Sequence, residues 1–90
     1  MYLARVIGTV VSTSKDERLV GFKLLLTRRL TEEGLVTGTP EVCVDTVGAG
    51  TGETVIVTKG SSARCAADRR EAPIDSTIVG IVDTVEIDGR

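Results

Sequence analysis

The sequence predicts a mostly β fold: a single small domain over residues 1–90, built as a five-stranded barrel with one short helix between the fourth and fifth strands. Two compositional facts support this. Apolar residues make up 41% of the chain, but only Tyr2 and Phe22 are aromatic, so the core must consist of Val, Ile and Leu. Five segments rich in these residues are separated by turn-forming clusters, whereas one late segment lacks strand character. Closure of five short strands into a barrel removes exposed sheet edges.

The first two segments predict a hairpin. Residues 2–14, "YLARVIGTVVSTS", are rich in β-branched residues and predict a long strand with Gly8 as a bulge or bend. The charged turn "KDERLVG" follows, and then "FKLLLTRRL", residues 22–30, alternates along its length. This alternation puts two sets of side chains on opposite faces, namely Phe22, Leu24, Leu26, Arg28 and Leu30 against Lys23, Leu25, Thr27 and Arg29.

Glycine and proline residues mark the boundaries of the remaining predicted elements. Residues 31–40, "TEEGLVTGTP", predict a loop, and residues 41–47 and 54–59 predict the third and fourth strands. Residues 61–70, "SSARCAADRR", predict a helix with serine as its N-cap, stopped by Pro73.

Residues 75–89 predict a fifth strand whose two faces are both apolar. Ile78 and Val82 lie on one face, and four further apolar residues lie on the other, namely Val79, Ile81, Val85 and Ile87. A strand that is apolar on both faces must be packed against other residues on both faces. Either the helix within the same subunit or a neighbouring chain can cover the second face.

The oligonucleotide/oligosaccharide-binding (OB) barrel is the nearest architecture to this element order. The alternative function suggested by that barrel is single-stranded nucleic-acid binding, which depends on aromatic stacking and a basic groove. With two aromatic residues and a net charge of −2, the chain offers neither. We therefore expect no nucleic-acid partner.

The turn "VGAGTGE" contains three alternating glycines and raises the possibility of a phosphate-binding loop. A dinucleotide fingerprint beginning at Gly48 needs glycine where the chain has Glu53, and a P-loop needs Gly-Lys-Ser/Thr where it has Gly52, Glu53 and Thr54. Both motifs also lead into a helix, whereas a strand is predicted here. We expect a turn whose glycines supply positive φ or close backbone approach.

The residue types argue against catalysis and cofactor binding. No histidine is present, so Ser61 and Ser62 have no evident general base. Cys43 and Cys65 are too few and too far apart for a zinc site, and we expect two buried free thiols, no metal and no cofactor. The chain has no apolar run long enough to span a bilayer and no signal-peptide pattern, which predicts a cytosolic protein that does not bind membranes.

Five motifs follow one another along the chain, namely "ARVIGTVVST", "LVGFKLLL", "VDTVGAGTGE", "GSSAR" and "PIDSTIVGIVD". In this order and spacing they resemble the pentameric vertex proteins of bacterial microcompartments, the EutN/CcmL-type family of carboxysomes and of ethanolamine- and propanediol-type organelles. The resemblance implies a non-enzymatic shell protein, located in the cytoplasm within the shell of a microcompartment. Its partners would be four further copies of itself, forming a ring at a vertex, and the hexameric shell proteins around that ring.

The resemblance also implies two sets of site residues. The subunit interface would contain the glycine turn, Gly48, Ala49, Gly50, Thr51, Gly52 and Glu53. The region near the five-fold axis and its pore would contain Gly60, Ser61, Ser62, Ala63 and Arg64. Arg64 could pair with a carboxylate such as Glu53, on the same or on the neighbouring chain. The sequence departs from the family pattern at Arg28, Arg29 and Thr54. These departures bear on the choice of partner more than on the fold.

Overall fold

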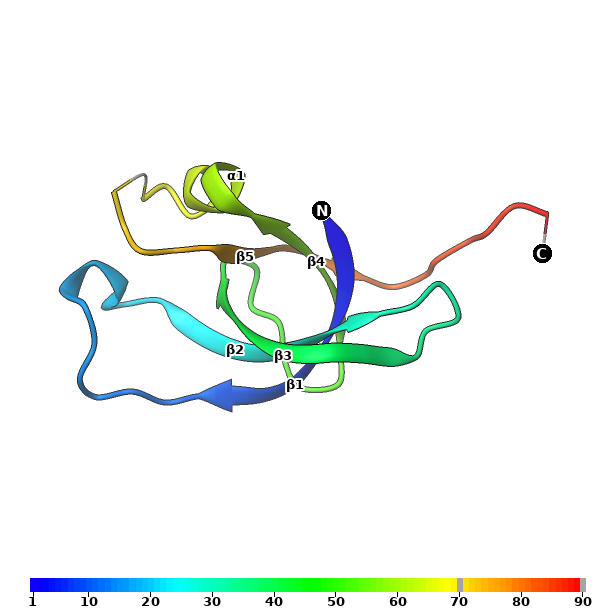
Figure 1. The fold of residues 1–90 in the computed structure, drawn as a ribbon, viewed down its shortest axis with the longest axis horizontal. Helices are drawn as coiled ribbons and strands as arrows, with labels where there is room; N and C mark the ends of the chain where they lie inside the picture. The colour runs from blue at the N-terminus through cyan, green and yellow to red at the C-terminus, as the bar shows by residue number, and fades with distance from the viewer. Residues whose placement is uncertain (70, 90) are drawn as a thin grey trace.

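The computed structural model describes residues 1–69 and 71–89, in which the strands close into a barrel in the order β1-β2-β3-β5-β4 (Figure 1). The strands are β1 (Tyr2–Val10), β2 (Lys23–Leu30), β3 (Val36–Asp45), β4 (Thr54–Lys59) and β5 (Ser76–Val82). A 3₁₀ turn, η1 (Glu17–Leu19), precedes β2, and helix α1 (Gly60–Ala66) joins β4 to β5. The predicted mostly β barrel, with its short helix between the fourth and fifth strands, is confirmed.

The hairpin of β1 and β2 has the predicted bulge. The pairing register shifts between Val6 and Gly8, as the glycine suggested. The first strand ends at Val10, earlier than the predicted Ser14, because Val10 pairs with Leu24 close to the start of β2. On β2 the buried face is the one that carries Leu25 and Thr27.

The third strand is longer than predicted. The loop extends only over residues 31–35, and β3 already pairs with β2 through Val36 and Leu30. Gly38 and Pro40 lie inside the strand, where Gly38 adopts a φ of +76° near a register shift in β2. The glycine and proline that predict a loop from the sequence instead belong to an irregular strand beside a bulge.

The helix and the last strand are both shorter than predicted. Helix α1 begins at Gly60, and its N-cap is Lys59 without a side-chain cap, so the predicted serine N-cap is wrong. The helix ends at Ala66, and the predicted last helical residue, Arg70, lies outside the described residues. Strand β5 ends at Val82, not at residue 89, because Val82 pairs with the first residue of β4 and no strand of the described chain continues alongside the residues that follow.

Two apolar clusters stabilise the fold. The barrel interior is filled by small and branched side chains, namely Ala4, Val6, Leu25, Cys43, Ala49, Val55, Val57 and Ile78. A second cluster lies beneath α1 and consists of Val44, Ala63, Ala67, Ala72 and Ile74, with Leu19, Phe22 and Leu24 packed against it. Alanines on the helix let it approach the barrel closely.

Helix α1 covers one part of β5. The Thr77 hydroxyl donates a hydrogen bond of 2.8 Å to the Ala63 carbonyl, whereas Ile81 nearer the end of the strand remains exposed. On the helix, Cys65 is exposed, so the expectation of two buried thiols holds only for Cys43. Cys65 belongs to the outward side of the helix, opposite the buried Ala63. Among the described residues, no helix has the length and apolar character needed to cross a membrane.

Candidate functional site

The glycine turn between β3 and β4 is held by a carboxylate at its start. Asp45 accepts hydrogen bonds from the backbone N–H groups of Val47, at 3.1 Å, and Ala49, at 3.0 Å. The Ala49 side chain is fully buried in the barrel interior, and the Lys23 ammonium donates to the Ala49 carbonyl at 3.0 Å. One buried alanine therefore anchors a turn whose other residues lie at or near the surface.

The end of the turn pairs with β1. Gly52 donates to the carbonyl of Val6 at 2.8 Å, and the Val6 N–H donates to the carbonyl of Glu53 at 3.0 Å. The Glu53 carboxylate accepts a 2.7 Å hydrogen bond from the Gly50 N–H, which closes the turn from within. Glu53 stands where a dinucleotide-binding motif would need glycine. Its carboxylate instead stabilises the turn itself, through the hydrogen bond from Gly50.

The three glycines of the turn are constrained differently. Gly48 and Gly52 have φ angles of +78° and +91°, a conformation that glycine adopts far more readily than other residues. Gly50 is outside that region, and a Cβ placed on it would meet its nearest atom, a Glu53 carboxylate oxygen, at an ordinary contact distance of 3.5 Å. The subunit alone therefore explains Gly48 and Gly52 but gives no reason for glycine at position 50.

The start of α1 forms the second predicted site. Gly60 has a φ of +64° and donates to the Asp75 carbonyl at 2.9 Å, which fixes the turn from β4 into the helix. Ser61 and Ser62 are exposed, while Ala63 is fully buried. A shallow hollow of about 430 Å³ is lined by Ser61, Ser62, Arg64 and Cys65.

Within one subunit the predicted pair of Arg64 and Glu53 does not form. The Arg64 guanidinium donates to the carbonyl of Ile74 at 3.5 Å, while the Glu53 carboxylate is bound to Gly50. The same-chain version of that pairing is therefore wrong. The turn at residues 48–53 and the helix start at residues 60–64 lie at opposite ends of β4, which separates the two side chains.

A polar cluster that sequence reasoning missed joins three strands. Glu41 of β3 accepts hydrogen bonds from the Tyr2 hydroxyl of β1 at 2.6 Å and from the Lys59 ammonium of β4 at 2.5 Å. The Arg29 guanidinium lies 3.8 Å from the centre of the Tyr2 ring. The only signal in the sequence was a tyrosine in a chain nearly free of aromatics, and its partner is 39 positions away.

The charges of this cluster shift the pKa values of its members. Lys59, and then the Tyr2 hydroxyl, lower the pKa of Glu41 by hydrogen bonding to its carboxylate. Glu41 in turn raises the pKa of Lys59, and burial followed by the hydrogen bond to Glu41 raises the pKa of Tyr2. Glu41 is thus ionised, and Lys59 and Tyr2 protonated, at neutral pH.

Among the described residues, no buried side-chain nitrogen or oxygen lacks a hydrogen-bond partner. The Thr27 hydroxyl lies 3.3 Å from the Cys43 sulfur, and burial raises the pKa of that thiol. No group of three or more His, Cys, Asp or Glu that could hold a metal ion occurs within residues 1–69 and 71–89.

Comparison with known proteins gives matches along almost the whole chain. The family model described as "Ethanolamine utilisation protein EutN/carboxysome" matches residues 1–83. The bacterial microcompartment shell vertex protein GrpN of Rhodospirillum rubrum (strain F11) is 60% identical over 86 residues, covering 96% of this chain and 97% of the relative. The shell vertex protein PduN of Salmonella typhimurium is 51% identical over 89 residues, covering 94% of this chain and 98% of the relative.

Solved structures agree with the sequence matches. The GrpN pentameric microcompartment shell protein from Rhodospirillum rubrum superposes with a TM-score of 0.86 at 60% identity, covering 97% of this chain and 98% of that chain. The structure of Gloeobacter violaceus CcmL superposes with a TM-score of 0.92 at 43% identity, covering 100% of this chain and 93% of that chain.

Proposed function

Because the chain belongs to the EutN/CcmL family of microcompartment shell vertex proteins, we propose that it is a structural shell protein that forms homopentamers at the vertices of a bacterial microcompartment. The similarity to a pentameric shell protein over nearly the full length of both chains carries this proposal. The protein then resides in the cytoplasm, as part of the shell of the compartment.

A pentamer has a defined geometric role in a shell. Hexagonal tiles cover a flat surface, and a closed polyhedron made from them needs five-fold units at its corners. A five-membered ring supplies that curvature, so its outer edge must contact hexameric shell proteins. These hexameric proteins are the proposed partners of the ring.

We assign the two surfaces described above to this assembly. Residues 48–53 form part of the contact between adjacent subunits, and residues 60–64 lie near the five-fold axis. Support for the first assignment comes from Gly50, whose lack of a side chain the isolated subunit does not require. A glycine at an exposed turn permits close approach of a second backbone. Support for the second comes from the exposed hollow at Ser61 and Ser62.

The chemistry of the chain favours a structural role over catalysis. No histidine is available as a general base, and the thiol of Cys43 is buried with a raised pKa that keeps it protonated. Ser61 and Ser62 are exposed at a helix start, and within the described residues no side-chain base is hydrogen-bonded to either hydroxyl. We propose that the protein has no enzymatic activity.

Native mass spectrometry tests the proposal directly. The unmodified protein should give one dominant species of five chains, and Gly50→Val should shift it toward monomer while its β-type circular dichroism is retained. Co-expression with hexameric shell proteins should give closed shells with the unmodified chain and shells open at their vertices with Gly50→Val. A monomer of the unmodified chain at micromolar concentration would refute the pentamer, and a Gly50→Val pentamer of full stability would remove the turn from the interface.

A further inference from the structure

The last residues of the chain form an arm that leaves the barrel. Residues 83–89, here called the C-terminal arm, follow the final strand pair of Val82 with Thr54 and run away from the barrel (Figure 1). No backbone hydrogen bond joins residues 83–87 to the rest of the described chain. Yet the segment has the alternating, β-branched pattern that led us to predict a strand here.

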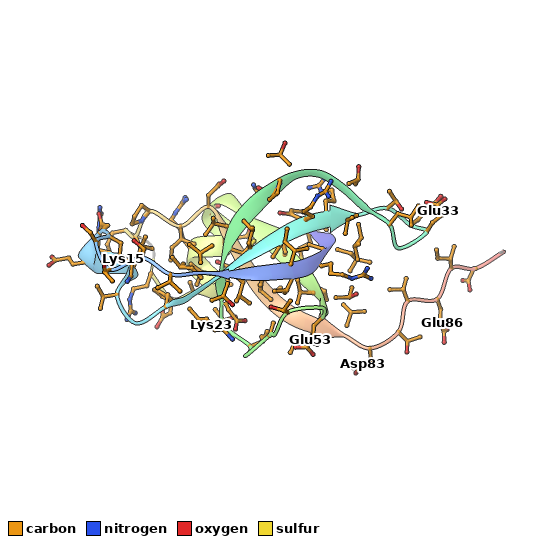
Figure 2. All side chains as sticks on the ribbon, turned by 90° about the horizontal axis from the view of Figure 1, so that it is seen from below. Lys15, Lys23, Glu33, Glu53, Asp83 and Glu86 are labelled. Atoms are coloured by element: carbon orange, nitrogen blue, oxygen red, sulfur yellow. The ribbon has the colours of Figure 1, made fainter. Side chains whose placement is uncertain are left out.

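The arm has one apolar and one polar face. In an extended segment Val85 and Ile87 point to the same side, while Glu86 and Asp88 point to the other. Val85 is 51% exposed and Ile87 is 36% exposed. Figure 2 shows Asp83 and Glu86 along the arm at one end of the molecule and Lys15 at the opposite end.

The subunit does not cover the apolar face of its own arm. Val85 and Ile87 line a hollow of about 400 Å³ together with Leu3 and Leu30 on the barrel, and both side chains stay exposed there. The arm and the tip of the β2–β3 hairpin are its two sides. A side-chain face that is strand-like, apolar and uncovered needs a partner outside the subunit.

A second hollow of matching character lies toward the other end of the molecule. It has a volume of about 190 Å³ and is bordered by Leu24, Val42, Val44 and Ile74, with Pro73 at its rim. Val42 is 49% exposed on this surface. The η1 turn and the segment before β5, which adjoin the hollow, lie at the end opposite the C terminus (Figure 1).

We propose that the C-terminal arm of one subunit docks on the next subunit, with Val85 and Ile87 over the hollow beside Val42. This inference rests on the proposed pentamer and names a contact within it. An arm at one end and an acceptor toward the other make a head-to-tail contact, and contacts of this heterologous type generate rings when the rotation closes. Within its own chain the arm points away from this hollow, because the hollow lies at Ser76, the first residue of β5, and the arm continues from Val82, the last residue of β5.

The size of the hollow agrees with the apolar face of the arm, and the charges of the two surfaces set the arm's orientation. The hollow, of about 190 Å³ and lined largely by apolar side chains, has room for small aliphatic side chains such as valine and isoleucine. Glu86 and Asp88 would face solvent in this arrangement. Lys59 lies between two carboxylates, Glu41 at 2.5 Å and Asp75 at 3.4 Å, so the edge of the hollow at Asp75 keeps a net negative charge. The acidic side chains of the arm must therefore point away from this edge, toward solvent.

Disulfide trapping between two differently tagged full-length chains tests the contact. One chain carries Val85→Cys and the other Val42→Cys, and both carry Cys65→Ser, which removes the exposed native thiol. Because a disulfide requires Cα atoms within roughly 7 Å, mild oxidation should give a covalent dimer of the two different chains. The matched control replaces Val42→Cys with Val11→Cys, an exposed position after β1, and should give no such dimer.

A pair of charge variants tests the same contact without cysteine. Val85→Asp should raise the subunit concentration needed for the pentamer by roughly tenfold or more, because a carboxylate would enter an apolar hollow. Thr84→Asp adds the same charge on the other face of the arm and should have little effect. Equal effects of the two variants, or an intrachain disulfide in a Val85→Cys/Leu3→Cys chain, would overturn the inference.

The two proposals fail in different ways. A monomeric unmodified chain would refute the pentamer itself. An intact pentamer without the disulfide between positions 85 and 42 would leave the vertex function in place and refute only the docking of the arm.

Discussion

Some glycines of the turn are needed for the fold of the subunit, whereas another is explained only by assembly. Gly52 has a φ of +91° and its N–H binds Val6, so its glycine is required by the subunit. Gly50 has no such backbone constraint and has room for a Cβ. Gly50 and Gly52 look equivalent in the sequence, but the physical reasons for having glycine at the two positions differ.

We therefore predict opposite behaviour for two alanine variants. Gly52→Ala should lower the free energy of unfolding by about 1–2 kcal/mol, the usual cost of a left-handed backbone for a residue with a Cβ. Gly50→Ala should leave the fold intact and weaken the pentamer. Thermal unfolding measured over a range of protein concentrations distinguishes them, because only a defect in assembly makes the loss depend on concentration. A loss for Gly50→Ala that is independent of concentration would contradict the assignment.

The two cysteines should differ sharply in reactivity. Cys65 is exposed on α1, whereas Cys43 is buried in the barrel and burial raises the pKa of its thiol. Since the thiolate is the reactive form, iodoacetamide should modify Cys65 in the native protein and Cys43 only after denaturation. Mass spectrometry of the intact chain would show one modification before and two after. Protection of both thiols in the native pentamer would instead place Cys65 beneath a neighbouring subunit.

At the scale of whole elements, the cluster around Glu41 links β1, β3 and β4 through side chains. Neither β1 nor β4 forms a strand pair with β3, so the hydrogen bonds from Tyr2 and Lys59 add a connection that the sheet lacks. Both partners favour the ionised carboxylate. The strength of this connection must therefore depend on pH.

The sign of that dependence follows from the lowered pKa of Glu41. A carboxyl group with a lowered pKa in the folded state contributes stability above its ordinary pKa of about 4.3, and this contribution disappears as the pH falls through the lowered value. Glu41→Gln should therefore unfold at a lower temperature than the unmodified chain at neutral pH, and the difference should vanish in strong acid. The hydrogen bond from Arg18 lowers the pKa of Asp16 to about 2. Asp16 titrates in both proteins, so its contribution to the pH dependence cancels when the two are compared. A difference that stays constant with pH would show that charge plays no part.

The elements also show what sequence patterns can and cannot predict. The bounds of β4 were predicted correctly, because its alternating β-branched residues are flanked by clear turn residues. The start of β3 was missed, because Gly38 and Pro40 mark an irregular strand as readily as a loop. The end of β5 was overestimated, since local propensity cannot reveal that β4 offers no partner beyond Thr54. For long-range side-chain pairs such as Tyr2 and Glu41, no local pattern identifies the partner, which lies 39 positions away.

At the scale of the whole molecule, the barrel and the arm are separable parts. The last strand pair of the barrel joins Val82 to Thr54, and the two core clusters of the described chain contain no residue beyond Ile78. The arm contributes exposed apolar side chains and no strand pairing. The fold therefore depends on residues 1–82, and the arm is available for assembly.

A chain that ends at Val82 should show this division directly. Removal of residues 83–90 leaves every strand pair and both core clusters in place, so the far-ultraviolet circular dichroism and the unfolding midpoint of the dissociated subunit should match those of the full chain. The pentamer should dissociate at a higher subunit concentration than the full chain, because the apolar face of Val85 and Ile87 is lost. Sedimentation velocity over a dilution series measures the second effect, and denaturant unfolding at the dilute end measures the first. A truncated chain that is unfolded would show that the arm supports the barrel itself, and one that assembles as tightly as the full chain would show that the arm makes no contact in the ring.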